Sequence, residues 1–301
     1  MNIPNSFSSI LGQSQAITLL QAGLKRDRVA PAYLFYGAPG VGRKLTAKAF
    51  IQALFQRSEL NHPDLLWIEP TYLEKGKMLT VTEAIAAGLQ RRAAPQVRLE
   101  QIRQLTDFLN HSPVRSNRLV IVIEAAETMA EAAANGLLKT LEEPGNATII
   151  LIAPTLTSLL PTLISRCQSI PFRRLSNEDL ATVLKIAGYE NLPQEILALA
   201  QGSPGAAINA YSQYQAIAPE LLQALEKLPQ SPRQALTLAK QVSKDLDFEV
   251  QIWLLDFLQQ SLWRSHANSQ ILTRLEQAAK QLQGYVQPRL VWEVLLLDLI
   301  A

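Results

Sequence analysis

The sequence predicts an α/β fold in its first half, with a doubly wound parallel sheet, followed by an all-α region. Short, fully apolar runs alternate with helical patterns up to Phe172, as in parallel strands that are covered on both faces. The first run leads directly into a glycine-rich turn that opens a helix. After Phe172 no further strand-like run follows, and helical patterns continue to the end of the chain.

Strands and helices are expected to alternate along the sheet-forming half. The strand candidates cover residues 33–36, Leu65–Ile68, Leu119–Ile123 and 148–152, and the helix candidates cover 44–55, Leu99–Leu109 and 130–141. This alternation predicts parallel strands joined by helical crossovers. Residues 71–96 are polar and mixed in charge, which predicts an inserted surface loop with one helix candidate at 82–92.

The helical half begins shortly after Phe172. Ser176, with Asp179 three residues later, predicts a helix start, because the serine oxygen can accept from an exposed backbone N–H. Short helices are expected up to Tyr211, with turns at Gly188 and at 202–205, and amphipathic helices from about Ala218 onward. These changes predict three domains, over residues 1–174, 175–213 and 214–301.

Composition limits the classes of function. The 301 residues are 48% hydrophobic and 18% charged, with a formal net charge of +2. A dedicated nucleic-acid binder is usually far more basic, so any DNA contact is expected to be local or shared with partners. The start of the chain lacks a signal-peptide pattern and no run is long enough to span a bilayer. With Cys167 as the single cysteine, we expect no disulfide framework and a cytoplasmic location.

The turn after the first strand has the framework of a phosphate loop. Gly37, Gly40 and Gly42 follow a strand and precede a helix, the setting in which backbone N–H groups converge on an anion. The full pattern requires lysine and then serine or threonine after the last glycine. Here Arg43 stands at the lysine position and Lys44 at the hydroxyl position.

Both departures weaken the case for bound Mg–ATP. Arginine is a longer, planar fork than the compact lysine ammonium. A charged Lys44 has no lone pair to offer a metal and would repel it, and Thr46 comes two positions too late. We interpret the glycines as evidence for the fold, and the two departures as evidence that the loop no longer binds Mg–ATP. An intact but unusual ATP site, and a metal-free phosphate held by the two cations, remain as alternatives.

A second acidic site follows the strand Leu119–Ile123. In P-loop ATPases one acid at this place binds Mg²⁺ through water, and a glutamate polarises the attacking water. Glu124 keeps a carboxylate at the metal position, whereas Ala125 offers only a methyl group to the water. The alternative is that Glu124 and Glu127 are only a solvated strand end and acids near a helix N-terminus.

The residues after this site carry a family resemblance. Asn-Gly-Leu-Leu-Lys-Thr-Leu-Glu-Glu-Pro at 135–144 and the Ser-Arg-Cys segment at 159–168 closely resemble AAA+ clamp-loader subunits. Residues 7–13 resemble the N-terminal entry of the same family, and residues 62–64 resemble the start of the second strand in its delta-prime subunits. The resemblance implies a RecA-like module, a small helical lid and a helical collar. It also implies a hetero-pentamer with tau/gamma and delta subunits that acts on the sliding clamp and primed DNA.

The resemblance also assigns roles to residues. Arg166 is implied to be an arginine finger that reaches the ATP of an adjacent subunit, with Ser165 and Cys167 fixing its loop. The alternative is a surface arginine that pairs locally. Ala206 stands where active clamp loaders carry an ATP-sensing arginine. The expected function is thus a non-hydrolysing accessory subunit of DNA polymerase III; the alternatives are an active tau/gamma or branch-migration ATPase and a scaffold in another assembly.

No metal or cofactor of its own is expected. Many delta-prime subunits carry four zinc-binding cysteines between the phosphate loop and the second strand, but residues 52–63 contain none. His62 alone cannot hold zinc. For ATP, the resemblance implies that the nucleotide is bound by the neighbouring subunit.

Overall fold

The computed structural model describes residues 6–57, 59, 61–88, 94–284 and 286–300. It divides into two compact units, the first ending at Asp179 and the second beginning at Leu180. This division lies five residues after the first predicted boundary, within the first turn of α7 (Asn177–Ile186). The predicted boundary near residue 213 lies inside the second unit and stays a prediction.

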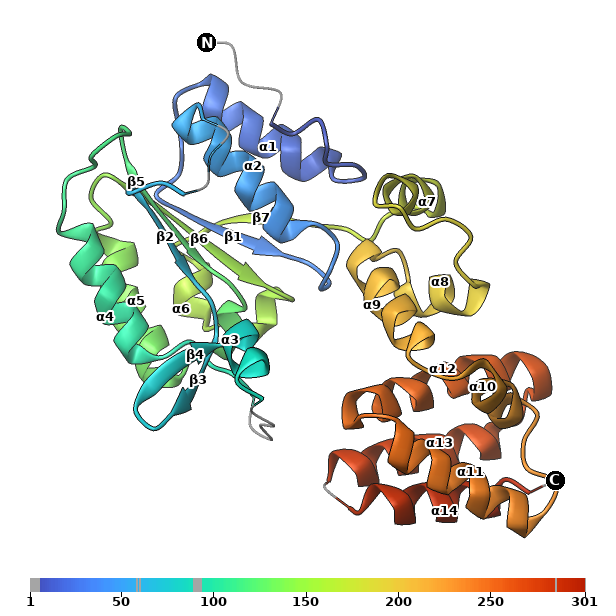
Figure 1. Ribbon diagram of the computed structural model, residues 1–301. Coiled ribbons are helices and arrows are strands. Elements are labelled where there is room, and N and C mark those ends of the chain that lie inside the picture. Colours follow the sequence, from blue (N-terminus) through green and yellow to red (C-terminus); the bar gives the residue numbers. More distant parts are fainter. Residues whose placement is uncertain (1–5, 58, 60, 89–93, 285, 301) are drawn as a thin grey trace. The chain divides into compact units, whose positions relative to one another are not determined.

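The first unit contains a five-stranded parallel sheet (Figure 1). Its order is β2-β5-β6-β1-β7, with β2 (Leu65–Ile68), β5 (Leu119–Ile123), β6 (Ala147–Ala153), β1 (Ala32–Tyr36) and β7 (Gln168–Pro171). The four predicted strands are confirmed. The edge strand β7 was missed because its sequence, Gln-Ser-Ile-Pro, is short and half polar.

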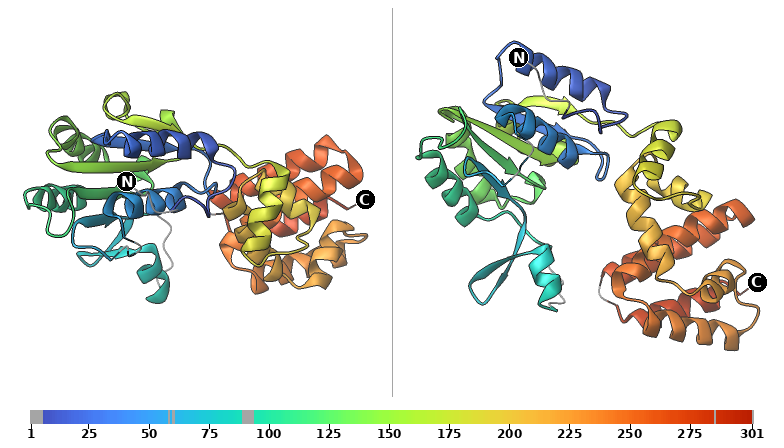
Figure 2. Two further views of the ribbon diagram at one scale, coloured as in Figure 1. Left: turned by 90° about the horizontal axis from the view of Figure 1, so that it is seen from above. Right: turned by 45° about the horizontal axis from the view of Figure 1, so that its top comes forward.

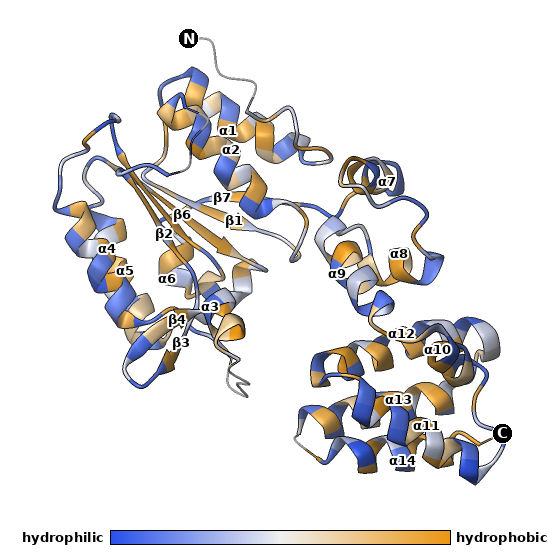
Figure 3. Ribbon diagram, in the orientation of Figure 1, coloured by the Kyte–Doolittle hydropathy of each residue, from blue (hydrophilic) through white to orange (hydrophobic). Residues whose placement is uncertain are grey.

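Helices cover both faces of this sheet. α1 (Ser14–Lys25) and α2 (Arg43–Phe55) lie on one face, and α4 (Leu99–Leu109) and α5 (Glu131–Glu142) on the other (Figure 1). Alternate residues of one strand enter opposite cores: Ile121 packs with α4 and α5, whereas Val120 packs with α1 and α2. Burial on both faces explains why β5 is apolar throughout and β6 is apolar except for Thr148 (Figure 3).

The segment 71–96 corrects the predicted loop. It forms a hairpin of β3 (Thr71–Glu74) and β4 (Lys77–Thr80), followed by the short helix α3 (Val81–Ala86) (Figure 2). Lys75 and Gly76 both have positive φ, as a two-residue hairpin turn requires. α3 starts with a Thr80–Glu83 capping box and ends at Ala86, short of the predicted residue 92; residues 89–93 lie outside the described residues.

The second unit is helical throughout its described residues. After α7 come α8 (Gln194–Ala200), α9 (Pro204–Gln215), α10 (Pro219–Glu226), α11 (Pro232–Asp245), α12 (Phe248–His266), α13 (Ser269–Gln283) and α14 (Pro288–Asp298). Ser176 caps α7 by accepting from the backbone N–H of Asp179 at 3.1 Å. The predicted turn at 202–205 is too long, because Ser203 caps α9 and the helix already includes Gly205.

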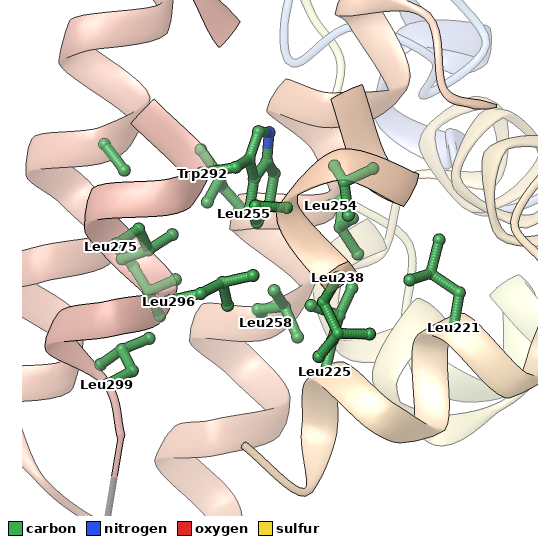
Figure 4. Close-up of a cluster of buried hydrophobic side chains, with 14 of the residues drawn as sticks. Leu221, Leu225, Leu238, Leu254, Leu255, Leu258, Leu275, Trp292, Leu296 and Leu299 are labelled. Atoms are coloured by element: carbon green, nitrogen blue, oxygen red, sulfur yellow. The ribbon is translucent and has the colours of Figure 1, made fainter. Parts of the chain in front are cut away.

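The core of helices α10 to α14 is built on leucines around one tryptophan (Figure 4). Trp292 is fully buried, and its indole N–H donates to Gln251 Oε1 at 2.9 Å. The Gln251 amide donates in turn to the carbonyl of Leu246, so the polar atoms brought in by the tryptophan are paired. None of the helices searched among the described residues has the length and apolar character to span a membrane.

Candidate functional site

The phosphate-loop framework lies between the end of β1 and the start of α2. Gly40 and Gly42 have φ values of 77° and 106°, in the region that glycine adopts without strain. A Cβ added at Gly37 would lie 2.3 Å from the carbonyl oxygen of Phe172, which follows β7. The first glycine is therefore required by the close approach of two chain segments, independently of any ligand.

Lys44 lies between two carboxylates at the carboxyl end of the sheet. Its Nζ is 2.5 Å from Glu124 Oε1, after β5, and 3.1 Å from Glu69 Oε1, after β2. The ammonium also lies 5.6 Å from the centre of the Trp67 ring, and the Trp67 indole donates to the same Glu124 oxygen. Burial is the largest influence on the pKa of Lys44 and lowers it, but the two carboxylates together outweigh it and raise the pKa.

The hydroxyl of Thr46, two residues after Lys44, is bonded within its own helix. Thr46 is fully buried, and its Oγ1 donates to the carbonyl oxygen of Gly42 at 3.0 Å. Glu124 thus pairs with the Lys44 ammonium and accepts from the Trp67 indole N–H. The cluster at this end of the sheet therefore consists of a cation and two carboxylates that pair with it, and the nearby threonine hydroxyl is bonded within its own helix.

Arg43 has a different environment from its neighbour. Among the described residues, its buried Nη1 has no hydrogen-bond acceptor. Burial lowers the pKa of Arg43, and the charge of Glu127 partly offsets this. Desolvation raises the pKa of Glu127. Its backbone hydrogen bond and the charge of Arg43 lower this pKa but only partly offset the rise. The two cations of the loop therefore interact with different acids: Lys44 with Glu69 and Glu124, and Arg43 with Glu127.

The turn after β5 has Ala125 in a strained backbone conformation. This residue has φ 44° and ψ 52°, a left-handed conformation that costs a residue with a side chain roughly 1–2 kcal/mol. The turn is supported by the Thr128 hydroxyl, which donates to the Ala125 carbonyl at 2.8 Å. The Ala125 side chain is a methyl group, so it offers no proton acceptor at this turn.

The Ser-Arg-Cys segment lies in the turn between α6 (Pro161–Ile164) and β7. Arg166 Nη2 is 2.5 Å from Glu142 Oε1, at the end of α5, and Nη1 donates to the carbonyl of Thr162 at 3.0 Å. Ser165 Oγ donates to the same carbonyl at 3.1 Å. Cys167 is partly buried against the core on the α4–α5 side, and burial raises the pKa of its thiol to about 12.

The histidine and aspartate ahead of β2 have structural contacts. Asp64 is fully buried, and its carboxylate accepts from the backbone N–H groups of Val114, Arg115 and Ser116 at 2.7–2.9 Å. His62 stacks on Phe55 with ring centroids 4.2 Å apart. Asp64 therefore fastens the loop that leads into β5. Among the described residues, no group of three or more His, Cys, Asp or Glu side chains could hold a metal ion.

Two family models together match nearly the whole chain. Residues 12–176 match the family described as "DNA polymerase III, delta subunit". Residues 178–299 match "Cyanobacterial DNA polymerase III delta prime, C-terminal domain". The first match alone spans more than half of the chain. This chain belongs to the DNA polymerase III clamp-loader family. The expected resemblance to delta-prime is confirmed, and the two matches meet close to the division between the two units.

Curated relatives are also DNA polymerase III subunits. The Pseudomonas aeruginosa subunit delta' is 33% identical over 201 residues, which are 60% of this chain and 55% of that protein. The Haemophilus influenzae subunit tau/gamma is 32% identical over 209 residues, which are 66% of this chain and 29% of that protein. The matched part of this chain thus spans from under a third to about half of the length of these clamp-loader relatives.

A solved structure shares the fold over nearly its full length. It is a DNA polymerase III gamma subunit-related protein from Thermotoga maritima, with a TM-score of 0.60 and 17% identity, covering 95% of this chain and 98% of that one. At this identity the likeness concerns the fold alone. It confirms the predicted architecture: a parallel sheet with covering helices, then an all-helical region.

Sequence reasoning placed the main candidates but missed two neighbours. The structure brings Lys44 and Glu124 together, and it places Arg166 beside Glu142. Glu69 and Trp67 were not considered, although both lie at or just after the end of β2, at the same sheet edge as Glu124. Their positions beside the last residue of the predicted strand Leu65–Ile68 could have identified them from the sequence.

Proposed function

We propose that this chain is a delta-prime-type subunit that does not hydrolyse ATP and that contributes Arg166 to an ATP bound by an adjacent clamp-loader subunit. The observation that carries the proposal is the ion pair between Lys44 and Glu124, at 2.5 Å. It puts a tethered ammonium beside the carboxylate that would bind the metal.

The chain lacks three groups that ATP hydrolysis would use. Mg²⁺ bound near Glu124 would have to displace Lys44, whose raised pKa keeps it charged at neutral pH. Ala125 cannot accept a proton from water. Ala206, in the first turn of α9, cannot pair with a phosphate. ATP hydrolysis requires the metal and a positioned water, so these residues support an inactive pocket.

Arg166 has the chemistry of a finger in trans. Guanidinium is permanently charged and presents a planar fork that fits phosphate oxygens. In the free subunit the Arg166 side chain is 35% exposed, so a neighbour can reach it. Arginine fingers contribute about 10³–10⁵ in rate to GTP hydrolysis, and we expect a value at or below this range here.

Assembly is the second part of the proposal. We infer a cytoplasmic hetero-pentamer with tau/gamma and delta subunits that loads a sliding clamp on primed DNA, without zinc or another cofactor in this chain. The relatives are named as tau/gamma and delta' subunits. On α14, Leu290, Val294 and Leu297 lie on one face and are 51%, 47% and 38% exposed. Such an apolar stripe suits a helical interface with another subunit.

Reconstitution of the complex tests both parts. We expect Arg166→Ala to enter the complex but to lower DNA-stimulated ATP hydrolysis at least tenfold, whereas Arg115→Ala, at another exposed arginine, leaves it unchanged. The purified chain alone should show no Mg-dependent ATP turnover. Turnover by the chain alone would favour the active ATPase, and full activity with Arg166→Ala would remove Arg166 from the reaction.

A further inference from the structure

Both terminal nitrogens of Arg166 are bonded within the free subunit. Nη2 lies 2.5 Å from Glu142 Oε1, and Nη1 donates to the Thr162 carbonyl at 3.0 Å. A phosphate that pairs with the fork through two parallel bonds uses the same nitrogens. The guanidinium cannot pair fully with a neighbour's phosphate while it keeps both of these contacts.

Glu142 is in an unfavourable place for the helix that carries it. It is the last residue of α5, where the helix dipole favours cations and disfavours carboxylates. Its side chain is 53% exposed, so packing does not explain it either. The ion pair with Arg166 is the contact from which this carboxylate gains.

We propose that Glu142 is a positioning residue that holds Arg166 against its own subunit until the triphosphate of an adjacent subunit takes the place of the carboxylate. This inference rests on the proposed finger role of Arg166. The exchange is between two anions for one cation, and no covalent bond changes. The triphosphate prevails because it offers more negative charge and several oxygens in the geometry of the fork.

The strength of the contact sets the size of the effect. Exposed ion pairs are weak, so Arg166 can be released readily. A protein whose binding-competent state is only partly populated binds its ligand less tightly by that fraction. Removing the competitor should therefore lower the KM for ATP by about two- to fivefold, as for the loss of one exposed ion pair, and leave kcat unchanged.

The test is steady-state ATP hydrolysis by the reconstituted complex with Glu142→Gln, which keeps the shape of the side chain and removes its charge. Glu143→Gln is the matched control, because it removes an exposed carboxylate one residue away. We expect a lower KM with unchanged kcat for Glu142→Gln only. In the double variant with Arg166→Ala, Glu142→Gln should have no further effect.

The outcomes separate this inference from the proposed function. If Arg166→Ala lowers hydrolysis but Glu142→Gln behaves like Glu143→Gln, the finger stands and the holding role of Glu142 is wrong. A lower kcat for Glu142→Gln would also overturn it, because that result means that Glu142 supports Arg166 in the transition state. If Arg166→Ala has no effect, both proposals fail together. Equal melting temperatures of the variants exclude misfolding as the cause.

Discussion

Lys44 Nζ lies 2.5 Å from Glu124 Oε1 and so joins the first turn of α2 to the end of β5. The proposed function places both residues at positions where a P-loop ATPase would provide metal ligands. Here the Lys44 ammonium neutralises the Glu124 carboxylate, as a bound metal ion would in such an ATPase. The stability of this sheet edge therefore depends on the protein's own charges.

Replacing Lys44 by threonine should make the protein respond to Mg²⁺. The change leaves the Glu69 and Glu124 carboxylates close together without a cation and adds a hydroxyl. We expect a loss of about 1 kcal/mol in the free energy of unfolding without divalent cations, with part of it regained in millimolar Mg²⁺. Urea unfolding with and without Mg²⁺ measures both effects. Lys48→Thr is the control, and equal Mg²⁺ stabilisation of the wild type would contradict the account.

Asp64 should make unfolding pH-dependent in acid. Burial raises the pKa of this carboxyl, but hydrogen bonds from residues 114–116 outweigh it and lower the pKa to about 2 from an ordinary 3.8. The stabilisation is complete above about pH 5 and is lost as the pH falls through 3.8 to about 2, because the unfolded state binds the proton first. The difference corresponds to roughly 2 kcal/mol.

Asp64→Asn should remove this pH dependence and lower stability at neutral pH. The amide nitrogen of asparagine cannot accept from a backbone N–H, so part of the set of hydrogen bonds is lost. Urea unfolding of both proteins between pH 2 and 7 is the measurement. Parallel curves for the wild type and the variant over this range would show that Asp64 does not carry the effect.

Cys167 should be almost unreactive in the folded protein. Burial raises the pKa of its thiol to about 12, and the thiolate is the reactive form. At pH 8 we expect labelling with a thiol reagent to be about a thousandfold slower than in the unfolded chain, as the lower thiolate fraction implies. As the single cysteine, it gives an unambiguous signal. Native labelling within tenfold of the unfolded rate would disprove this.

Gly37→Ala should destabilise the protein more than Gly42→Ala. A Cβ at Gly37 would meet the Phe172 carbonyl oxygen at 2.3 Å, whereas a Cβ at Gly42 would meet no atom within 4 Å and would face only the strain of its φ of 106°. We expect losses of more than about 2 kcal/mol and of about 1 kcal/mol, respectively. Thermal unfolding of both variants measures the two losses. A larger loss for Gly42→Ala than for Gly37→Ala would contradict the packing described at Gly37.

The central sheet was predictable because its strands are buried on both faces. β5 and β6 contain apolar residues almost throughout, and this pattern needs no tertiary information. β7 and the β3–β4 hairpin were missed for the opposite reason. Gln168 and Ser169 lie in an edge strand that pairs on one side only, and the hairpin depends on a Lys75–Gly76 turn between short, mixed segments.

The candidate site was predictable residue by residue but not contact by contact. Arg43, Lys44 and Arg166 were identified from spacing and resemblance. The position of Glu69 beside Lys44 depends on β2 being the neighbour of β5, which no local pattern states. The contact of Arg166 with Glu142 joins residues 24 positions apart through the packing of α5 and α6.

The central claim is most directly tested by ATP hydrolysis in the reconstituted complex carrying Arg166→Lys. This substitution keeps the positive charge and removes the planar fork, so loss of activity can be assigned to pairing with phosphate. The account predicts normal assembly with DNA-stimulated hydrolysis reduced at least tenfold. Hydrolysis at the wild-type rate would contradict it.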